Sequence, residues 1–130
     1  MTIVDLPFHV RHGAKRLRRL IVKSLAETNV IVVFRSRLRD DADLNALALA
    51  GERMVELASK MPGFLSYKDF AADDGESTSI VEFSDMDSLL AWRNHPEHLA
   101  VQQRGREEFF AAYEIHVCQP LRSYCFHGNR

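Results

Sequence analysis

Residues 64–83, FLSYKDFAADDGESTSIVEF, form the stretch of the chain that decides the fold. Phe64–Phe70 and Ser77–Phe83 are rich in β-branched and aromatic residues. Between them, residues 73–76 (DDGE) are typical of a tight turn. The stretch therefore predicts a β-hairpin.

A strand and a helix are predicted before this hairpin. Val30–Leu38, VIVVFRSRL, is short and β-rich, which favours a strand. Asp43 follows two further aspartates and suits the N-cap of a helix. Apolar residues then recur at helical spacing over residues 43–61, and Pro62-Gly63 ends the pattern.

A second helical region and a last strand are predicted after the hairpin. Ser84 or Asp85 caps a helix that the sequence Asn94-His95-Pro96 interrupts, because a residue before proline is pushed out of the α region. Residues 96–111 again show helical spacing. Alternating apolar residues over 113–126 predict a long final strand.

The predicted order of elements is β-α-β-β-α-β, which is the ferredoxin-like α+β arrangement with an antiparallel sheet. Such a sheet has helices on one face only. Its other face is expected to carry too many apolar and aromatic residues to remain in water. We therefore expect that face to pack against a second copy, giving a homodimer.

Charge is distributed unevenly along the chain. The 130 residues are 46% hydrophobic and 27% charged, with a net charge of −1. Residues 1–29 carry six Arg and Lys against two acidic residues, a net +4, which leaves −5 for residues 30–130. We interpret 1–29 as a basic extension, containing one amphipathic helix over 14–27, and 30–130 as the folded domain.

The extension has several possible roles. We favour a helix that docks on the domain, or a dispensable leader, over one that binds an anionic membrane surface or nucleic acid, because the helix over 14–27 has no aromatic stacking residue and no recognition motif follows it. Deletion of residues 1–28 is expected to leave the dimer folded.

No apolar run reaches the roughly 20 residues of a membrane span. Two cysteines make no disulfide framework, so a reducing, cytoplasmic setting is expected.

Polar and aromatic residues concentrate at the predicted helix break. Residues 92–98 read WRNHPEH, and Arg104 and Arg106 follow. A tryptophan beside polar donors at a helix break is typical of a pocket wall. The alternative for each residue alone is structural: Trp92 in the core, His95 as a helix cap, and the arginines in solvent. A metal site is disfavoured because His95 and His98 have no third ligand at helical spacing.

Residues 30–124 resemble the antibiotic biosynthesis monooxygenase domain. The most specific matching segments are MPGF at 61–64 and AWRNHPEHLAVQQRGR at 91–106. The resemblance implies a dimeric α+β barrel, in which each protomer holds a pocket between its own sheet and helices. Members of that family include cofactor-free oxygenases acting on anthrones or quinols, and haem-degrading enzymes.

The resemblance carries over residue by residue only in part. Trp92 matches the tryptophan common to both branches. The haem-degrading branch has its axial histidine nine or ten residues later, where this chain has Val101 and Gln102, and an asparagine where this chain has Ser36. The cofactor-free branch has a tyrosine six residues after the tryptophan, and this chain has His98, which is able to form hydrogen bonds or act as a base.

We therefore predict a cofactor-independent monooxygenase acting with O2 on a small aromatic, quinol-like or polyketide-type substrate, with no cofactor and no metal. His98 is the candidate base, and Asn94 or Arg106 the candidate donor to the developing anion. The other candidate pocket residues are Trp92, Tyr67, Tyr113 and His95.

Two alternatives stay open at this point. The first is a dimer of the same fold that binds a small molecule without turnover. The second is a haem-binding protein with an iron ligand among His95, His98 and His116.

Overall fold

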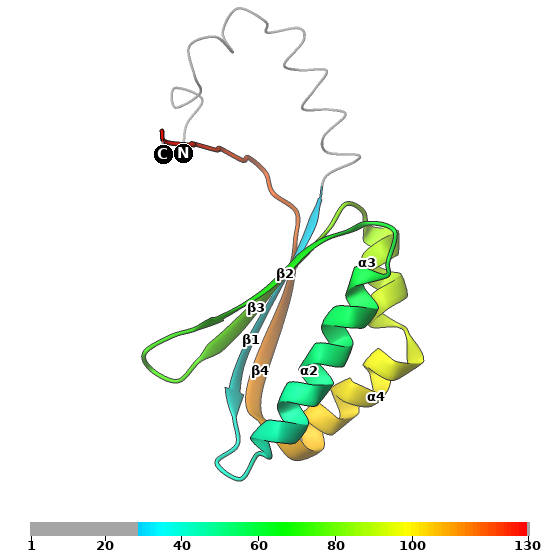
Figure 1. Ribbon diagram of the computed structural model, residues 1–130, viewed down its shortest axis with the longest axis vertical. Coiled ribbons are helices and arrows are strands. Elements are labelled where there is room, and N and C mark those ends of the chain that lie inside the picture. The colour runs from blue at the N-terminus through cyan, green and yellow to red at the C-terminus, as the bar shows by residue number, and fades with distance from the viewer. Residues whose placement is uncertain (1–28, 130) are drawn as a thin grey trace, which may run out of the picture.

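The computed structural model describes residues 29–129 and confirms the predicted order of elements. Four strands and three α-helices follow one another, with a π-helical turn, η3, before the last strand (Figure 1). Their bounds are β1 Val30–Leu38, α2 Leu44–Ser59, β2 Phe64–Ala71, β3 Ser77–Phe83, α3 Met86–Arg93, α4 Pro96–Arg104, η3 Gly105–Phe109 and β4 Phe110–Cys118.

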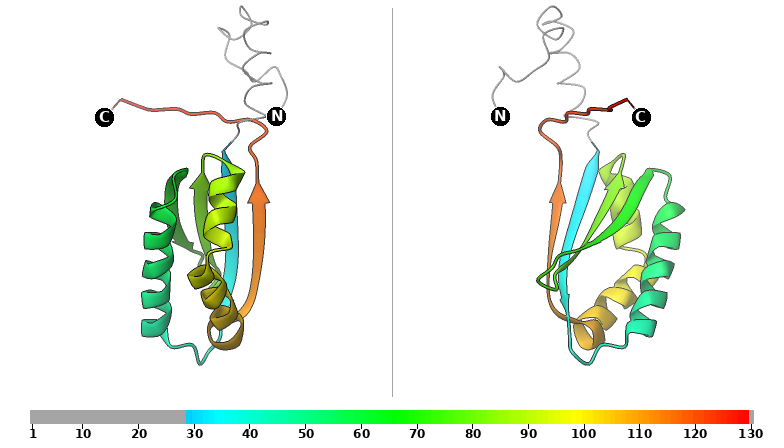
Figure 2. Two further views of the ribbon diagram at one scale, coloured as in Figure 1. Left: turned by 90° about the vertical axis from the view of Figure 1, so that its right-hand side faces the viewer. Right: turned by 60° about the vertical axis from the view of Figure 1, so that its left-hand side comes forward.

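The strands form one antiparallel sheet in the order β2-β3-β1-β4. Figures 1 and 2 show the helices on one face of this sheet, with the other face uncovered. This arrangement is the ferredoxin-like α+β fold that the sequence predicts. The helices do not lie over all four strands, because β4 stands at the edge beyond α2 and α3 (Figure 2).

The core fills the space between the helices and one half of the sheet. Val30 pairs with Phe83 and Val32 with Val81, so two apolar rows cross the centre of the sheet. Burying such side chains is the main stabilising contribution in a domain of this size. The helices complete the same cluster with Met54, Leu57, Ala58, Leu89 and Trp92.

Aspartates fix where two of the helices begin. The Asp43 carboxylate accepts a hydrogen bond from the Ala46 N–H at 3.0 Å, and Asp85 accepts one from the Ser88 N–H at 2.7 Å. These side chains satisfy backbone donors that a helix N-terminus leaves unpaired. Of the two predicted caps of α3, Asp85 is therefore the one used.

Two predicted boundaries near the C-terminus are wrong. The helical region ends before Phe110, which begins β4, and β4 ends at Cys118 instead of residue 126. Cys118 pairs with Ile31 at the start of β1, so the neighbouring strand offers almost no further partner. Pro120 also lacks the N–H that a ladder needs.

The predicted distribution of aromatic residues between the two faces of the sheet is only partly right. By alternation Phe70 lies on the uncovered face, because it pairs with Thr78 opposite Arg35, but three other aromatic residues do not. Phe34 and Tyr67 line the cavity on the helix side, and Tyr113 pairs with Ser36 and packs against Phe34 on that same side. The uncovered face instead mixes β-branched and charged residues. By strand alternation these are Ile31, Val33, Ile80, Arg35, Arg37, Glu82 and Glu114.

The predicted basic helix over residues 14–27 lies outside the described residues. Within residues 29–129, no helix has the length and apolar character needed to cross a membrane.

Candidate functional site

A cavity of about 830 Å³ lies between the sheet and the helices. All four strands contribute to its floor, and α2, α3 and α4 contribute to its walls. It begins where the apolar core ends. Along one side lie Ile115 and Val117, which are exposed residues of the edge strand β4. The volume falls in the range of small-molecule sites, and its position agrees with the pocket expected from the resemblance.

Trp92 forms one wall of this cavity from α3. Its side chain is buried and donates a hydrogen bond from Nε1 to the Met54 carbonyl in α2, at 3.2 Å. Its ring lies 4.2 Å from the His98 ring and 5.6 Å from the Phe83 ring, measured between centroids. Trp92 is thus both a core residue and a cavity wall, because its ring bridges the two.

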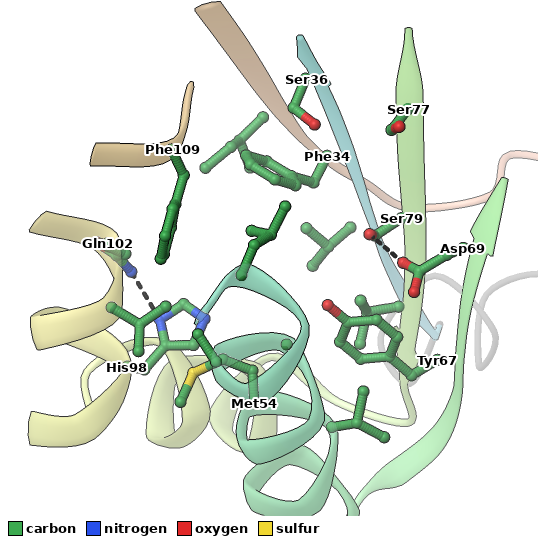
Figure 3. Close-up of a pocket in the computed structure, with 18 of the residues that line it drawn as sticks. Phe34, Ser36, Met54, Tyr67, Asp69, Ser77, Ser79, His98, Gln102 and Phe109 are labelled. Carbon is green, nitrogen blue, oxygen red and sulfur yellow. Dashed lines mark hydrogen bonds between the residues drawn. The ribbon is translucent and has the colours of Figure 1, made fainter. Parts of the chain in front are cut away.

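His98 belongs to α4, lies beside Trp92 and also lines the cavity. Gln102, one helical turn later, places its Nε2 2.7 Å from His98 Nδ1 (Figure 3). Burial lowers the pKa of His98 from 6.5 to about 4, and a hydrogen bond to the backbone of Arg93 opposes this shift. The imidazole is therefore neutral at pH 7.

A polar group faces the cavity from the sheet. Tyr67 and Asp69 on β2 lie opposite Val81 and Ser79 on β3, on the helix side of the sheet. Ser79 Oγ donates a hydrogen bond to one oxygen of the Asp69 carboxylate, and the Tyr67 hydroxyl points toward the same place (Figure 3). Burial raises the pKa of Tyr67, so its phenol stays protonated.

Sequence reasoning did not identify Asp69 and Ser79 as cavity residues. The available signal was their position in alternating strands: each lies two residues from an apolar or aromatic residue that faces the helices. Asp69 lies on the edge strand β2 and is exposed, so its carboxylate reaches solvent as well as the cavity.

Asn94 and His95 lie at the junction of α3 and α4. Asn94 is the C-cap of α3, and His95 is the N-cap of α4, where its Nδ1 accepts a hydrogen bond from the Glu97 N–H at 3.2 Å. Neither lines the cavity. The junction places Trp92 and His98 next to each other, so these two residues shape the site through the backbone.

Arg106 and Tyr113 lie close to each other but not on the cavity lining. Arg106 Nη1 is 3.4 Å from the Tyr113 hydroxyl, and both side chains reach solvent. Tyr113 packs against Phe34, which does line the cavity. The structure thus brings together Trp92, His98 and Tyr67 from the predicted set.

The histidines considered as haem ligands do not share a site. His98 alone lines the cavity, and its Nδ1 contacts Gln102. His95 caps a helix, and His116 lies on the uncovered face of the sheet, 3.2 Å from Glu114. No group of three or more potential ligands among His, Cys, Asp and Glu gathers in residues 29–129. Of these three histidines, only His98 therefore reaches the cavity.

The sequence profile of the antibiotic biosynthesis monooxygenases matches residues 29–104, which extend from β1 through α4. The chain belongs to this family. One relative is the uncharacterized protein YqjZ of Bacillus subtilis, 35% identical over 78 residues, which are 60% of this chain and 68% of YqjZ.

Solved structures of the same fold include Rv0793 of Mycobacterium tuberculosis. It has a TM-score of 0.65 and 23% identity over 75% of this chain and 100% of that chain. SnoaB of Streptomyces nogalater, a cofactor-independent oxygenase, has a TM-score of 0.62 and 15% identity over 74% of this chain and 96% of its own. At these identities the likeness establishes the fold alone.

Proposed function

We propose that this protein is a cofactor-independent monooxygenase that oxidises a small aromatic substrate of the quinol or anthrone type with O2. The observation that carries the proposal is the cavity of about 830 Å³ beside Trp92 and His98, in a chain of this family. The cavity is large enough for two or three fused rings, and aromatic side chains form much of its wall.

The chemistry balances without a further reductant. For an anthrone-type methylene, two C–H bonds break and one C=O bond forms, so the carbon loses four electrons. One O2 accepts these four electrons: one oxygen atom enters the product, and the other leaves as water with the two protons. Removal of the first proton gives an electron-rich carbanion that is able to react with O2 directly.

His98 is the candidate group for moving that proton. Its low pKa keeps the imidazole unprotonated at pH 7, which is the form that accepts a proton. With a pKa of about 4, the resulting imidazolium is about as acidic as a carboxylic acid, so it returns the proton readily to the departing oxygen. The neutral ring is correspondingly a weak base, which suits a substrate whose C–H is already acidic. Trp92 excludes water from one side and holds the aromatic substrate.

We further propose that the chain forms a homodimer through the uncovered face of the sheet. That face presents Ile31, Val33 and Ile80 between charged residues of both signs, which makes it self-complementary across a two-fold axis. Cys118 and Cys125 are both free and exposed, which is consistent with a reducing, cytoplasmic setting. A stable monomer at micromolar concentration in gel filtration would contradict the dimer.

The activity is tested by O2 consumption with a panel of anthrones and hydroquinones in chelator-treated buffer. The expected result is a substrate-dependent rate that falls at least tenfold in the double variant Trp92→Phe, His98→Ala. The control variant His127→Ala removes an exposed imidazole outside the cavity and should retain the wild-type rate.

The contrary result is equally well defined. If the wild type consumes O2 no faster than the double variant, and the double variant melts cooperatively, the monooxygenase proposal is wrong. Stabilisation of the wild type against heat by the same aromatics, without O2 consumption, would instead identify a small-molecule-binding dimer.

A further inference from the structure

One end of the cavity floor carries the carboxylate of Asp69, which is exposed on the edge strand β2 and also lines the cavity. Asp69 lies on β2 between Tyr67 and Ala71 and pairs with Ser79 across the hairpin. In the same strand pair, two residues away, Val81 is almost fully buried in the core. Asp69 therefore faces the helices and lines the cavity.

The hydrogen bonding of Asp69 leaves it able to bind a ligand. Ser79 Oγ donates to Oδ1 of the carboxylate, and the structure shows no hydrogen bond from residues 29–129 to Oδ2. Figure 3 shows this second oxygen pointing toward the Tyr67 side chain. A carboxylate is an acceptor only, so a ligand atom placed there has to donate a proton to it.

The charges around the cavity favour a neutral ligand at this end. Asp69 is joined on the floor by the hydroxyl groups of Ser77 and Ser36, and no cationic side chain lines the strand side of the cavity. The one arginine in the lining, Arg93, belongs to α3 in the opposite wall. A ligand carboxylate near Asp69 would meet like charge without compensation.

We propose that Asp69, held by Ser79, is a specificity-determining subsite that selects aromatic ligands bearing a neutral hydroxyl group and rejects anionic ones. The subsite binds the hydroxyl as a donor to the free carboxylate oxygen. Its link to turnover rests on the proposed monooxygenase function, but the binding preference itself does not require turnover.

The preference is measured with three probes that share one ring system: 2-naphthol, 2-methoxynaphthalene and 2-naphthoate, by isothermal titration calorimetry at pH 7. 2-Naphthol is a neutral donor at this pH, the ether has no donor, and the carboxylate is an anion. The wild type should bind 2-naphthol more tightly than either of the other probes.

Asp69→Asn is the informative variant. It should reduce the preference for 2-naphthol over 2-methoxynaphthalene about tenfold or more, since hydrogen bonds to charged groups are the strong ones. It should also strengthen binding of 2-naphthoate. Asp73→Asn removes a carboxylate from the hairpin turn, outside the cavity, and should leave all three affinities at wild-type values.

A second variant keeps the proposal testable if Asp69→Asn fails to fold. Ser79→Ala removes the hydroxyl that orients Asp69 and should lower the same preference about threefold. An unchanged preference in a folded variant, or no binding of any probe by the wild type, overturns the subsite. O2 consumption with unchanged preference refutes the subsite alone, whereas selective binding without O2 consumption refutes only the monooxygenase.

Discussion

Acidification should destabilise this protein through the partly buried imidazole of His98. Burial lowers the pKa of His98 from 6.5 to about 4, so between these pH values the unfolded chain binds a proton that the folded chain does not. Stability therefore rises with pH across this window. The stability that depends on the neutral His98 ring is fully present above pH 6.5 and is lost as the pH falls toward 4.

The size of the effect follows from the width of the window. About 2.5 pH units at 1.36 kcal/mol per unit would give about 3.4 kcal/mol for a completely buried group. Because the His98 side chain is only partly buried, solvent screens part of the penalty, and we expect about 2 kcal/mol. That is a large share of the stability of a small domain.

The assay is urea unfolding at fixed protein concentration, at pH 7, 6, 5 and 4.5, for the wild type and His98→Gln. The variant lacks the titrating ring, so its stability should fall less steeply between pH 6.5 and 4.5. Carboxylates whose pKa is lowered, such as Glu97 beside Arg53, also lose stabilisation in acid, but they do so in both proteins. The control His127→Gln should follow the wild type, and equal slopes for wild type and His98→Gln would refute the reasoning.

Further substitutions test the packing around the cavity. Trp92→Phe removes the hydrogen bond to the α2 backbone and part of a buried ring, so the free energy of unfolding in urea should fall by about 2 kcal/mol. A decrease of less than half that size would contradict the role of Trp92 in the core. Gly63→Ala would place a Cβ 2.5 Å from Ser88 Oγ, so the unfolding free energy should fall by about 1–3 kcal/mol, and an unchanged melting temperature would be the contrary result. The Arg53–Glu97 pair between α2 and α4 is about 40% exposed, so solvent screens it and a double-mutant cycle should give only a weak coupling.

The sequence predicted the fold well because its signals are local and agree with one another. The turn at residues 73–76, the proline after α2 and the aspartate caps each fix a boundary, and the apolar rows of β1 and β3 pair as the alternation requires. The C-terminal region was predicted less well because its limits are set by partners: β4 ends where β1 begins.

The site was predicted in part, for a geometric reason. A regular α-helix over residues 96–111 would place Arg106 on the same face as Gln103 and Phe110. The turn of η3 is wider than that of an α-helix, and this alters the direction of the residues after Arg104. Arg106 therefore reaches solvent, whereas Phe109 is buried. Tyr113 lies on the predicted side of its strand but at an edge that the helices do not cover.

The cavity itself results from a change in side-chain size along the sheet. At one end, the rows Val30–Phe83 and Val32–Val81 fill the space beneath the helices. In the next rows, β3 contributes Ser79 and Ser77 instead, opposite Phe34 and Ser36 of β1. Serine lacks the volume to reach the helix layer, and its hydroxyl needs a hydrogen-bonding partner, so the helices cannot close over these rows as they do over the apolar ones. A sheet that gives up hydrophobic burial over two rows loses stability, and one of these serines, Ser79, holds a carboxylate that lines the cavity. Because Asp69 is exposed, packing neither requires nor opposes this carboxylate, and binding of a ligand hydroxyl would give it a role.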